Sequence, residues 1–283
     1  MQDNDLPFDK SRSVALTRRS FAALSLTAGA AAAMAADAVQ ETDIVIPMAD
    51  GACDAALFQP AGTGAWPGCL IFTDALGLRP AFRDMGRRLA AEGYVVLVPN
   101  PFYRTRKAPV LSGPFDFASP DDRAKLVPLT APLTTEVKTR DGAAWIAYLD
   151  TLPQVKKTTP LGVSGYCMGG PYTMFTAAAV PDRVGAAGSF HGGNLVTDKP
   201  DSPHLLGPKI KASYYFAIAT NDDQRQPDAK DKLREAFPGK PVTVEVYQDC
   251  QHGWCVSDAK VYNQAEADRA FTELVALYQK ALI

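Results

Sequence analysis

One short stretch near the middle of the chain constrains its fold more than any other. Residues 164–170 read SGYCMGG, with the apolar run LGV before them and the helix-like stretch Pro171–Ala179 after them. A sharp strand-to-helix turn forces its central residue into strained backbone angles and leaves no room for neighbouring Cβ atoms. Glycines at Gly165 and Gly169 fit that requirement. We therefore predict a strand, a tight turn and a helix, with Cys167 at the apex.

Cys167 in this position is a candidate nucleophile. The free N–H groups and the dipole of the following helix favour a thiolate over a thiol, and they can help to bind an oxyanion. A buried structural cysteine beside a glycine turn is the alternative, because free cysteine is among the most buried residue types. The rest of the sequence has to decide between them.

A nucleophile of this kind needs a base, and all three histidines of the chain follow Cys167. His252 lies in the polar loop DCQHGW, after the strand-like run Val242–Tyr247 and before a C-terminal helix. Loops at strand ends commonly carry catalytic groups. His191, in FHGG after an apolar strand, is expected to line the site and is the alternative base. His204 is expected at the surface.

The acid that orients the base is expected between the nucleophile and the histidine in the chain. The apolar run Tyr214–Ala219 ends in the polar sequence TNDD. Asp222 is the preferred acid and Asp223 the second choice. Both aspartates also suit a plain structural role, since Asp favours strand ends and helix caps, here for a helix beginning near Pro227.

Taken together, these motifs resemble those of the dienelactone hydrolases, cysteine-dependent members of the α/β-hydrolase superfamily. The resemblance extends from about Thr42 to the C-terminus. It rests on the elbow GYCMGG, the pair Asn221-Asp222, the loop QHGW and two earlier segments, residues 73–78 and 93–100. It implies an α/β-hydrolase fold and a catalytic triad of Cys167, His252 and Asp222.

The resemblance also assigns further roles. The backbone N–H groups of Met168 and Ala75 would form the oxyanion hole, and Asp74 stands where the family has a glutamate that interacts with the thiol. Arg104 matches one of the arginines that hold a substrate carboxylate, although it also belongs to the basic run RTRK, which suits a solvated loop. The other arginine falls near Val256, so the identity of the substrate is open.

Three residues next to these motifs, Tyr166, His191 and Trp254, are expected to bind substrate. The expected chemistry is acyl transfer to sulfur and hydrolysis of the thioester, on dienelactones or related small lactones and esters, as in a carboxymethylenebutenolidase-like carboxylic ester hydrolase (EC 3.1.1.-). A general carboxylesterase or thioesterase and a non-catalytic binding protein with the same fold are the alternatives. No cofactor or metal is expected, because the chain has no HExxH, CxxC or phosphate-loop motif.

The N-terminus predicts export. Residues 17–21 read TRRSF and precede an alanine-rich, weakly apolar run, Ala22–Ala36, which resembles a twin-arginine signal and is too short for a stable membrane span. Cleavage is expected after Ala38 or after Ala35. We expect the twin-arginine export machinery as a partner, a signal in residues 1–38 and a periplasmic enzyme in residues 39–283, or a cytoplasmic one if the N-terminus is not a signal.

The net charge and the number of cysteines limit the binding partners and the disulfide pairings that we expect. A formal net charge of −2 argues against nucleic acid or an anionic membrane as a partner. The odd number of cysteines, 5, leaves at least one unpaired in a monomer, and Cys167 is expected to be free. Pairing among the other four, Cys53, Cys69, Cys250 and Cys255, stays open, including a bridge between the last two or two reduced thiols there.

Strand-like and helix-like runs alternate along the chain, which predicts one domain with a mainly parallel sheet and helices on both faces. We expect a first hairpin within residues 44–58, six core strands after it, and helices over Pro80–Glu92 and Thr135–Leu149. The stretch Tyr103–Pro132 is expected to be irregular, either as a lid over the site or as a surface loop.

Overall fold

The computed structural model describes residues 39–283, and the predicted export signal lies outside these described residues. None of their helices is both long and apolar enough to cross a membrane. The elements are β1 (Val39–Met48), β2 (Gly51–Pro60), β3 (Gly68–Phe72), α2 (Pro80–Ala91), β4 (Val95–Pro99), α3 (Pro120–Thr130), α4 (Thr135–Thr151), β5 (Leu161–Tyr166), α5 (Gly169–Ala179), β6 (Val184–Phe190), the 3₁₀ helix η1 (Pro203–Lys209), β7 (Ser213–Ala219), α6 (Thr220–Arg225), α7 (Ala229–Glu235), β8 (Val242–Tyr247) and α8 (Gln264–Leu282).

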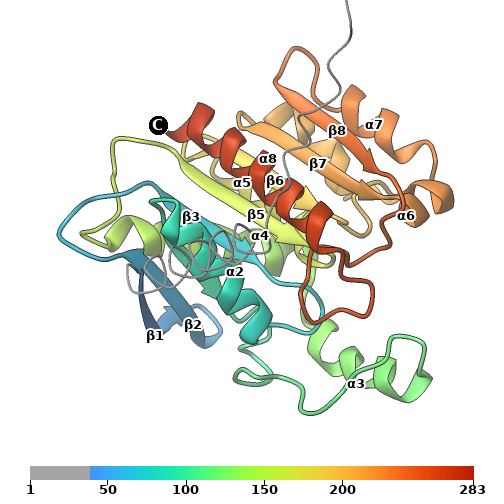
Figure 1. Cartoon of the computed structure of the whole chain (residues 1–283), viewed down its shortest axis with the longest axis horizontal. Coiled ribbons are helices and arrows are strands. Elements are labelled where there is room, and N and C mark those ends of the chain that lie inside the picture. Colours follow the sequence, from blue (N-terminus) through green and yellow to red (C-terminus); the bar gives the residue numbers. More distant parts are fainter. Residues whose placement is uncertain (1–38) are drawn as a thin grey trace, which may run out of the picture. The chain divides into compact units, whose positions relative to one another are not determined.

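An eight-stranded sheet forms the centre of this unit, in the order β1-β2-β4-β3-β5-β6-β7-β8 (Figure 1). β1 pairs antiparallel with β2, and β2 antiparallel with β4; every further pair, from β4 to β8, is parallel. Parallel strands covered on both faces are apolar along their whole length. β3 (GCLIF) and β4 (VVLVP) are such strands, with every residue buried.

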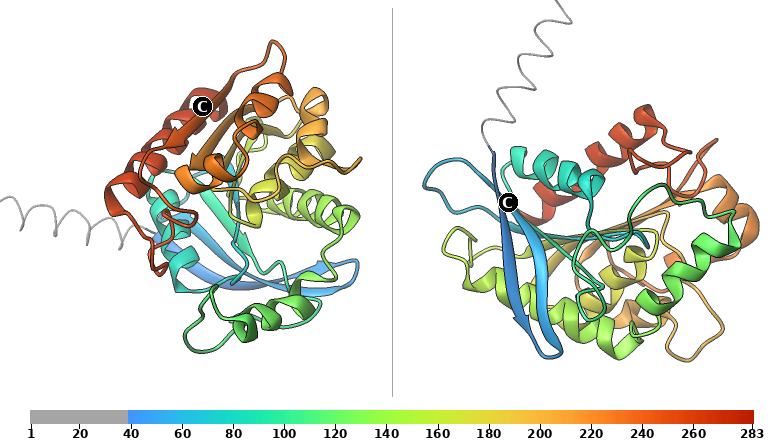
Figure 2. Two further views of the ribbon diagram at one scale, coloured as in Figure 1. Left: turned by 90° about the vertical axis from the view of Figure 1, so that its right-hand side faces the viewer. Right: turned by 90° about the horizontal axis from the view of Figure 1, so that it is seen from below.

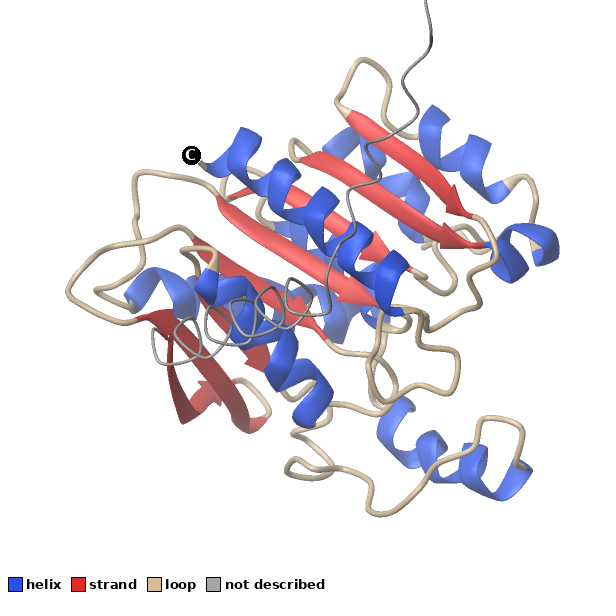
Figure 3. Cartoon of the chain, viewed as in Figure 1, coloured by secondary structure: helices blue, strands red, loops and turns tan. Residues whose placement is uncertain are grey.

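Helices cover both faces of the sheet, as predicted (Figures 2 and 3). On one face, α2 and α8 pack Phe82 and Tyr278 into a core cluster with the strands. On the other face, α4 and α5 contribute Trp145 and Met174 to a second cluster. The predicted α/β-hydrolase architecture is confirmed.

The stretch after β4 is less irregular than expected, because it contains α3. Ser119 caps this helix by accepting a hydrogen bond from the Asp122 N–H at 3.3 Å. Pro120 occupies the first turn, where a missing N–H costs nothing, and Asp121 and Asp122 complement the helix dipole there. The abundance of proline and charge in the sequence therefore marked a capped helix start as well as a loop.

The parallel arrangement determines where the candidate residues lie. Asp74 follows β3, Cys167 follows β5, His191 follows β6, Asp222 lies just after β7, and His252 follows β8. The carboxyl ends of parallel strands meet at one edge of the sheet, and that edge is where ligands bind in open α/β sheets. Residues up to 178 positions apart in sequence are gathered there for this reason.

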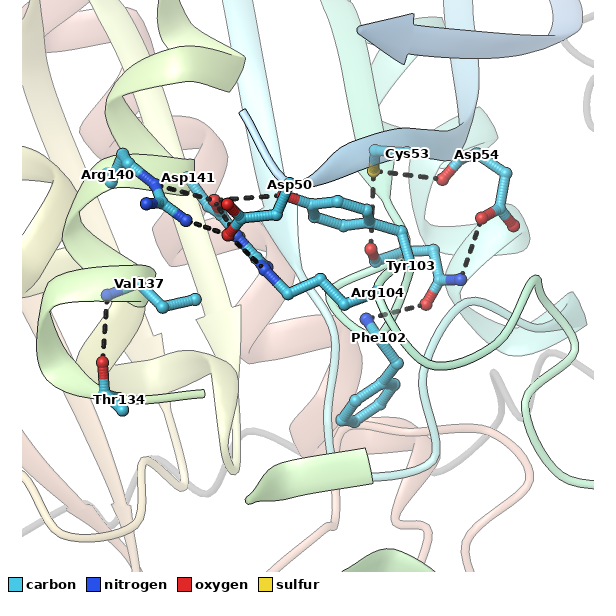
Figure 4. A network of polar contacts seen from close by, with 11 residues as sticks. Asp50, Cys53, Asp54, Phe102, Tyr103, Arg104, Thr134, Val137, Arg140 and Asp141 are labelled. Atoms are coloured by element: carbon cyan, nitrogen blue, oxygen red, sulfur yellow. Dashed lines mark hydrogen bonds and ion pairs between the residues drawn. The ribbon is translucent and has the colours of Figure 1, made fainter. Parts of the chain in front are cut away.

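A buried ion-pair network fixes the start of the segment after β4 (Figure 4). Arg104 donates from both terminal nitrogens to the Asp141 carboxylate of α4, at 2.6 and 2.7 Å, and from Nε to Asp50 of the β1–β2 turn at 2.8 Å. The Tyr103 hydroxyl also donates to Asp141 at 3.3 Å. The Asp141 side chain is 2% exposed, so this network ties the hairpin, the segment and α4 together in a water-poor setting.

We expect Asp141→Asn to lower the free energy of unfolding by about 3 kcal/mol, because removing one partner of a buried pair leaves the other charge uncompensated. Urea denaturation followed by circular dichroism measures this. Asp182→Asn is the matched control: Asp182 is 82% exposed in its pair with Lys211, so its loss should leave the denaturation midpoint unchanged. Equal effects of both substitutions would contradict the structural role of the network.

Candidate active site

Cys167 lies at the apex of the predicted turn, with a positive φ of 52°. The turn is so tight that the positions two residues before and two residues after the cysteine have no room for a Cβ atom. A Cβ on Gly165 would overlap the carbonyl of Gly169, and a Cβ on Gly169 would overlap the carbonyl of Phe72. The close packing explains the glycines that the sequence analysis singled out, and it makes Cys167 the least buried cysteine of the chain.

Backbone hydrogen bonds hold this strained conformation. The Cys167 N–H donates to the Phe190 carbonyl at 3.1 Å. Its own carbonyl accepts from Gly170 at 3.1 Å and from Gly193 at 3.0 Å. A non-glycine residue at positive φ persists only where its surroundings enforce it. Here bonds from β6, the loop after it and α5 all converge on one residue.

His252 and Asp222 meet at the same edge of the sheet. The Nδ1 atom of His252 lies 2.7 Å from Oδ2 of Asp222, within hydrogen-bonding distance. The Asn221 side chain accepts from the His252 N–H at 2.9 Å, so the short helix α6 holds both the ring and the backbone of the histidine. The role of Asn221 was not foreseen, because only the folded loops show that its amide reaches His252.

The local charges favour a protonated His252. Burial lowers the pKa of the ring, but hydrogen bonding to Asp222 and to the neighbouring Cys167 sulfur outweighs it and raises the pKa to about 10. Arg225 contacts the other oxygen of Asp222 from the surface. A carboxylate within hydrogen-bonding distance of an imidazole favours its protonated form.

The structure discriminates between the two candidate acids. Asp223 points to Lys230 of α7, whose ammonium is 2.7 Å from its carboxylate, whereas Asp222 faces the histidine. His204, expected at the surface, is partly buried, and its Nδ1 lies 2.7 Å from the Ser202 hydroxyl. The geometry therefore brings Cys167, His252 and Asp222 together and leaves the alternatives elsewhere.

His191 is not an available base. Its ring is buried, with its centroid 5.0 Å from that of His252 and 5.2 Å from that of Trp254. Burial, together with the charge of His252, holds the pKa of His191 well below its ordinary value. The neutral His191 ring packs against the rings of His252 and Trp254.

Two further residues expected to bind substrate are buried in the core, like His191. Tyr166 stacks on Phe190 at 5.1 Å between ring centroids and meets Phe82 edge-on at 5.7 Å. Trp254 is fully buried and stacks on Tyr247 at 4.9 Å. Successive residues of a strand point to opposite faces, so Tyr166 at the end of β5 joins the α2–α8 layer.

Asp74 is engaged by an arginine. Arg79 donates to both carboxylate oxygens, at 2.6 and 2.8 Å, and the Leu76 N–H donates to one of them at 2.9 Å. The carboxylate is thus paired within its own loop and at the start of α2. Among residues 39–283, the N–H groups of Ala75 and Met168 donate to no other group, which leaves both available to an oxyanion.

Arg104 is likewise occupied. The contacts with Asp141 and Asp50 described above engage Nε and both terminal nitrogens, and the guanidinium also lies 4.4 Å from the centre of the Tyr103 ring. Val256, near which the family resemblance would place a second carboxylate-binding arginine, is buried. A substrate carboxylate would therefore have to displace two aspartates to reach Arg104.

The remaining cysteines are buried thiols. None of the five cysteines, all within residues 39–283, is paired, so the bridge considered between Cys250 and Cys255 is absent. Burial raises the pKa of both thiols. In the same part of the chain, no three His, Cys, Asp or Glu side chains gather where they could hold a metal ion.

Two cavities border the Cys167 residue, with volumes of about 410 and 300 Å³. Gly193 and Asn194, in the loop after β6, line both of them. Lys138 of α4 lines the larger one and was not foreseen. A signal for it exists in the sequence, because Lys138 precedes the buried Gly142 and Trp145 by one and two helical turns.

Comparison with known proteins adds a family and a fold to this geometry. Residues 53–282 match the family described as "Dienelactone hydrolase family". A carboxymethylenebutenolidase-like protein of Synechocystis is 26% identical over 249 residues, 86% of this chain and 98% of that protein. Among solved structures, a dienelactone hydrolase-like protein of Klebsiella pneumoniae superposes with a TM-score of 0.74 at 19% identity, over 86% of this chain and 99% of its own. An acetyl xylan esterase of Paenibacillus sp. R4 reaches 0.60 at 14% identity, over 87% and 85%.

The charge environment of His252 gives a measurable prediction. In a ¹⁵N-histidine NMR titration, we expect an apparent pKa of about 10 for wild-type His252, against about 6.5 for an unperturbed ring. Asp222→Asn should move this pKa downwards because it removes a carboxylate that favours the protonated ring. Asp223→Asn, one residue away but facing Lys230, should leave it in place. A wild-type value below 7 would refute the proposed electrostatics.

Proposed function

The chain belongs to the dienelactone hydrolase family, and from this premise we propose that it hydrolyses small esters or lactones through an acyl-thioester on Cys167. The observation that carries the proposal is that Cys167, His252 and Asp222 line one cavity, where the His252 ring lies 2.7 Å from the Asp222 carboxylate. A nucleophile, a base and a group that orients the base are the parts that acyl transfer needs.

In the first half of the reaction, the Cys167 thiolate attacks the substrate carbonyl and a carbon–sulfur bond forms. The carbonyl oxygen becomes an oxyanion, which the N–H groups of Met168 and Ala75 stabilise. When the tetrahedral intermediate collapses, the carbon–oxygen bond to the leaving group breaks. The departing alkoxide takes the proton held by the His252 imidazolium, so the alcohol leaves neutral.

In the second half, His252 is a neutral base with its tautomer fixed by Asp222. It takes a proton from a water molecule as the water oxygen bonds to the thioester carbonyl. The carbon–sulfur bond then breaks, and the thiolate returns beside the imidazolium. Loss of one oxyanion-hole donor typically lowers the rate by about 10²- to 10³-fold, so both N–H groups matter to this cycle.

The leading substrate is a dienelactone or a related small lactone or ester. A general carboxylester or thioester is the second candidate, and one observation favours it. Arg104, the expected anchor for a dienelactone carboxylate, is taken up by Asp141 and Asp50. A substrate that relied on that anchor would be held less well here.

Substitutions at the proposed triad test the mechanism. We expect Cys167→Ala to abolish hydrolysis of p-nitrophenyl acetate, and His252→Ala and Asp222→Asn each to lower kcat by about 10³-fold or more. The matched control is Asp223→Asn, which should keep wild-type kcat/KM. If Cys167→Ala retained turnover, or if the two aspartate variants were equally impaired, the proposed mechanism would be wrong.

We also propose that the chain is exported by the twin-arginine route. The support is the sequence TRRSF before an alanine-rich run. In a bacterial host, replacing Arg18 and Arg19 together by lysine should keep the protein in the cytoplasm. The wild type should be found in the periplasm with Val39 or Ala36 as its first residue. Equal distribution of the two forms between the fractions would contradict export by this route.

A further inference from the structure

The space around Cys167 divides into two arms. The larger cavity, about 410 Å³, lies between the start of α4, α5 and the loop Gly193–Pro203; we call it the Lys138 arm. The smaller one, about 300 Å³, runs over β7, α6 and α7, and we call it the apolar arm. Cys167 lies on the wall of both, so a carbonyl group at its sulfur can extend a substituent into each.

The ammonium of Lys138 is the distinctive group of the first arm. Among residues 39–283, no carboxylate forms an ion pair with it, although Lys211 and Lys230 have one each. The ammonium lies 5.7 Å from the centre of the Tyr172 ring, which is buried beneath it. Burial lowers the pKa of Lys138, and the nearby Asp201 carboxylate offsets this only in part. An anion bound in the arm would supply a further negative charge.

The other charges of this arm leave it positive. Lys199 contributes a second ammonium at the exposed rim, and Asp201 contributes the single carboxylate. One oxygen of Asp201 accepts from the Thr135 hydroxyl at 2.7 Å. Two ammonium groups against one carboxylate give the arm a net charge of about +1. The arm therefore favours an anion over a neutral group.

Apart from the proposed catalytic residues, the wall of the second arm is formed largely by aliphatic side chains. Leu195, Val196, Ile218 and Leu233 are all buried side chains that form its wall, and Ala229 lines its other side. A surface of this kind favours an apolar substituent. Its charged lining residues other than His252 are Asp222 and Arg225, which pair with each other, so this arm lacks the uncompensated positive charge of the Lys138 arm.

Building on the proposed hydrolase function, we infer that the substrate is an open-chain ester with an anionic group on one side of the carbonyl and an apolar group on the other, and that Lys138 selects the anion. In a lactone, the carbon and oxygen substituents of the carbonyl are joined in one ring. Both therefore extend to the same side of the carbonyl, and a small lactone would fill one arm at most. An open-chain ester occupies both arms.

The test compares two p-nitrophenyl esters of glutarate: the hemiester, which carries a free carboxylate, and its neutral methyl ester. We expect wild-type kcat/KM to be about 10-fold higher for the anionic ester, the usual size of a hydrogen bond to a charged group. Lys138→Met should remove this preference and leave the neutral ester within about 2-fold of wild type. Lys280→Met, in the last turn of α8, is the control for loss of one positive charge and should keep the preference.

The outcomes separate the inference from the function on which it rests. Equal wild-type turnover of the two esters, or equal losses for both in Lys138→Met, would overturn the inference and leave the hydrolase intact. Absence of turnover on any ester would instead refute the proposed function.

A second readout tests the anion arm without turnover. Alkylation of Cys167 by iodoacetate should be slower in Lys138→Met, and alkylation by the neutral iodoacetamide should keep its wild-type rate. Equal effects on the two reagents would overturn the role of Lys138.

Filling the apolar arm with Ala229→Phe should lower turnover of the aromatic hemiester more than that of monomethyl glutarate, and equal losses would contradict the two-arm arrangement.

Discussion

The close packing of backbone around Cys167 is the constraint on which the site depends. Gly165 lets α5 approach β5, and Gly169 lets α5 approach the end of β3, so closely that no side chain fits at either position. In this close packing the cysteine adopts a positive φ of 52°. The strain has a cost, and hydrogen bonds with β6, the loop after it and α5 offset it. A side chain larger than hydrogen at either glycine would move the nucleophile relative to its base.

The site also depends on the polar and charged groups around His252, which come from more than one loop. His252 is held by its backbone at Asn221 and by its ring at Asp222, and Cys167 lines the same cavity. These contacts come from the ends of different strands, and parallel pairing aligns those ends at one edge. The strand order thus brings these residues, which are distant in sequence, to one place. The same edge carries two cavities that border Cys167, one lined by Lys138 and the other by a group of buried aliphatic side chains.

Local patterns predicted the architecture well. The glycine turn, the core strands and the two long helices were recognisable because each is determined by its own residues, and the triad candidates followed from chain order. Predictions that needed a tertiary partner fared differently. Asp74 and Arg104 carry suitable charges, but Arg79 and Asp141 meet them only in the folded chain. Tyr166 and Trp254 lie next to motif residues in sequence and yet point into the core. The spacing of Lys138 to Gly142 and Trp145 places it on the buried side of α4, but that spacing does not reveal the cavity, which the loop after β6 helps to form.

The central claim is that the acyl group passes through the Cys167 sulfur, and rapid-quench mass spectrometry tests it most directly. Protein quenched in acid during turnover of p-nitrophenyl acetate should show a mass increase of one acetyl group, about 42 Da, on the peptide that contains Cys167. The modification should be removed by neutral hydroxylamine, as a thioester is. Its population should rise in Asp222→Asn if the slower base delays hydrolysis of the thioester more than its formation. Turnover with no acylated Cys167 peptide at any quench time, or acylation at another residue, would contradict the account.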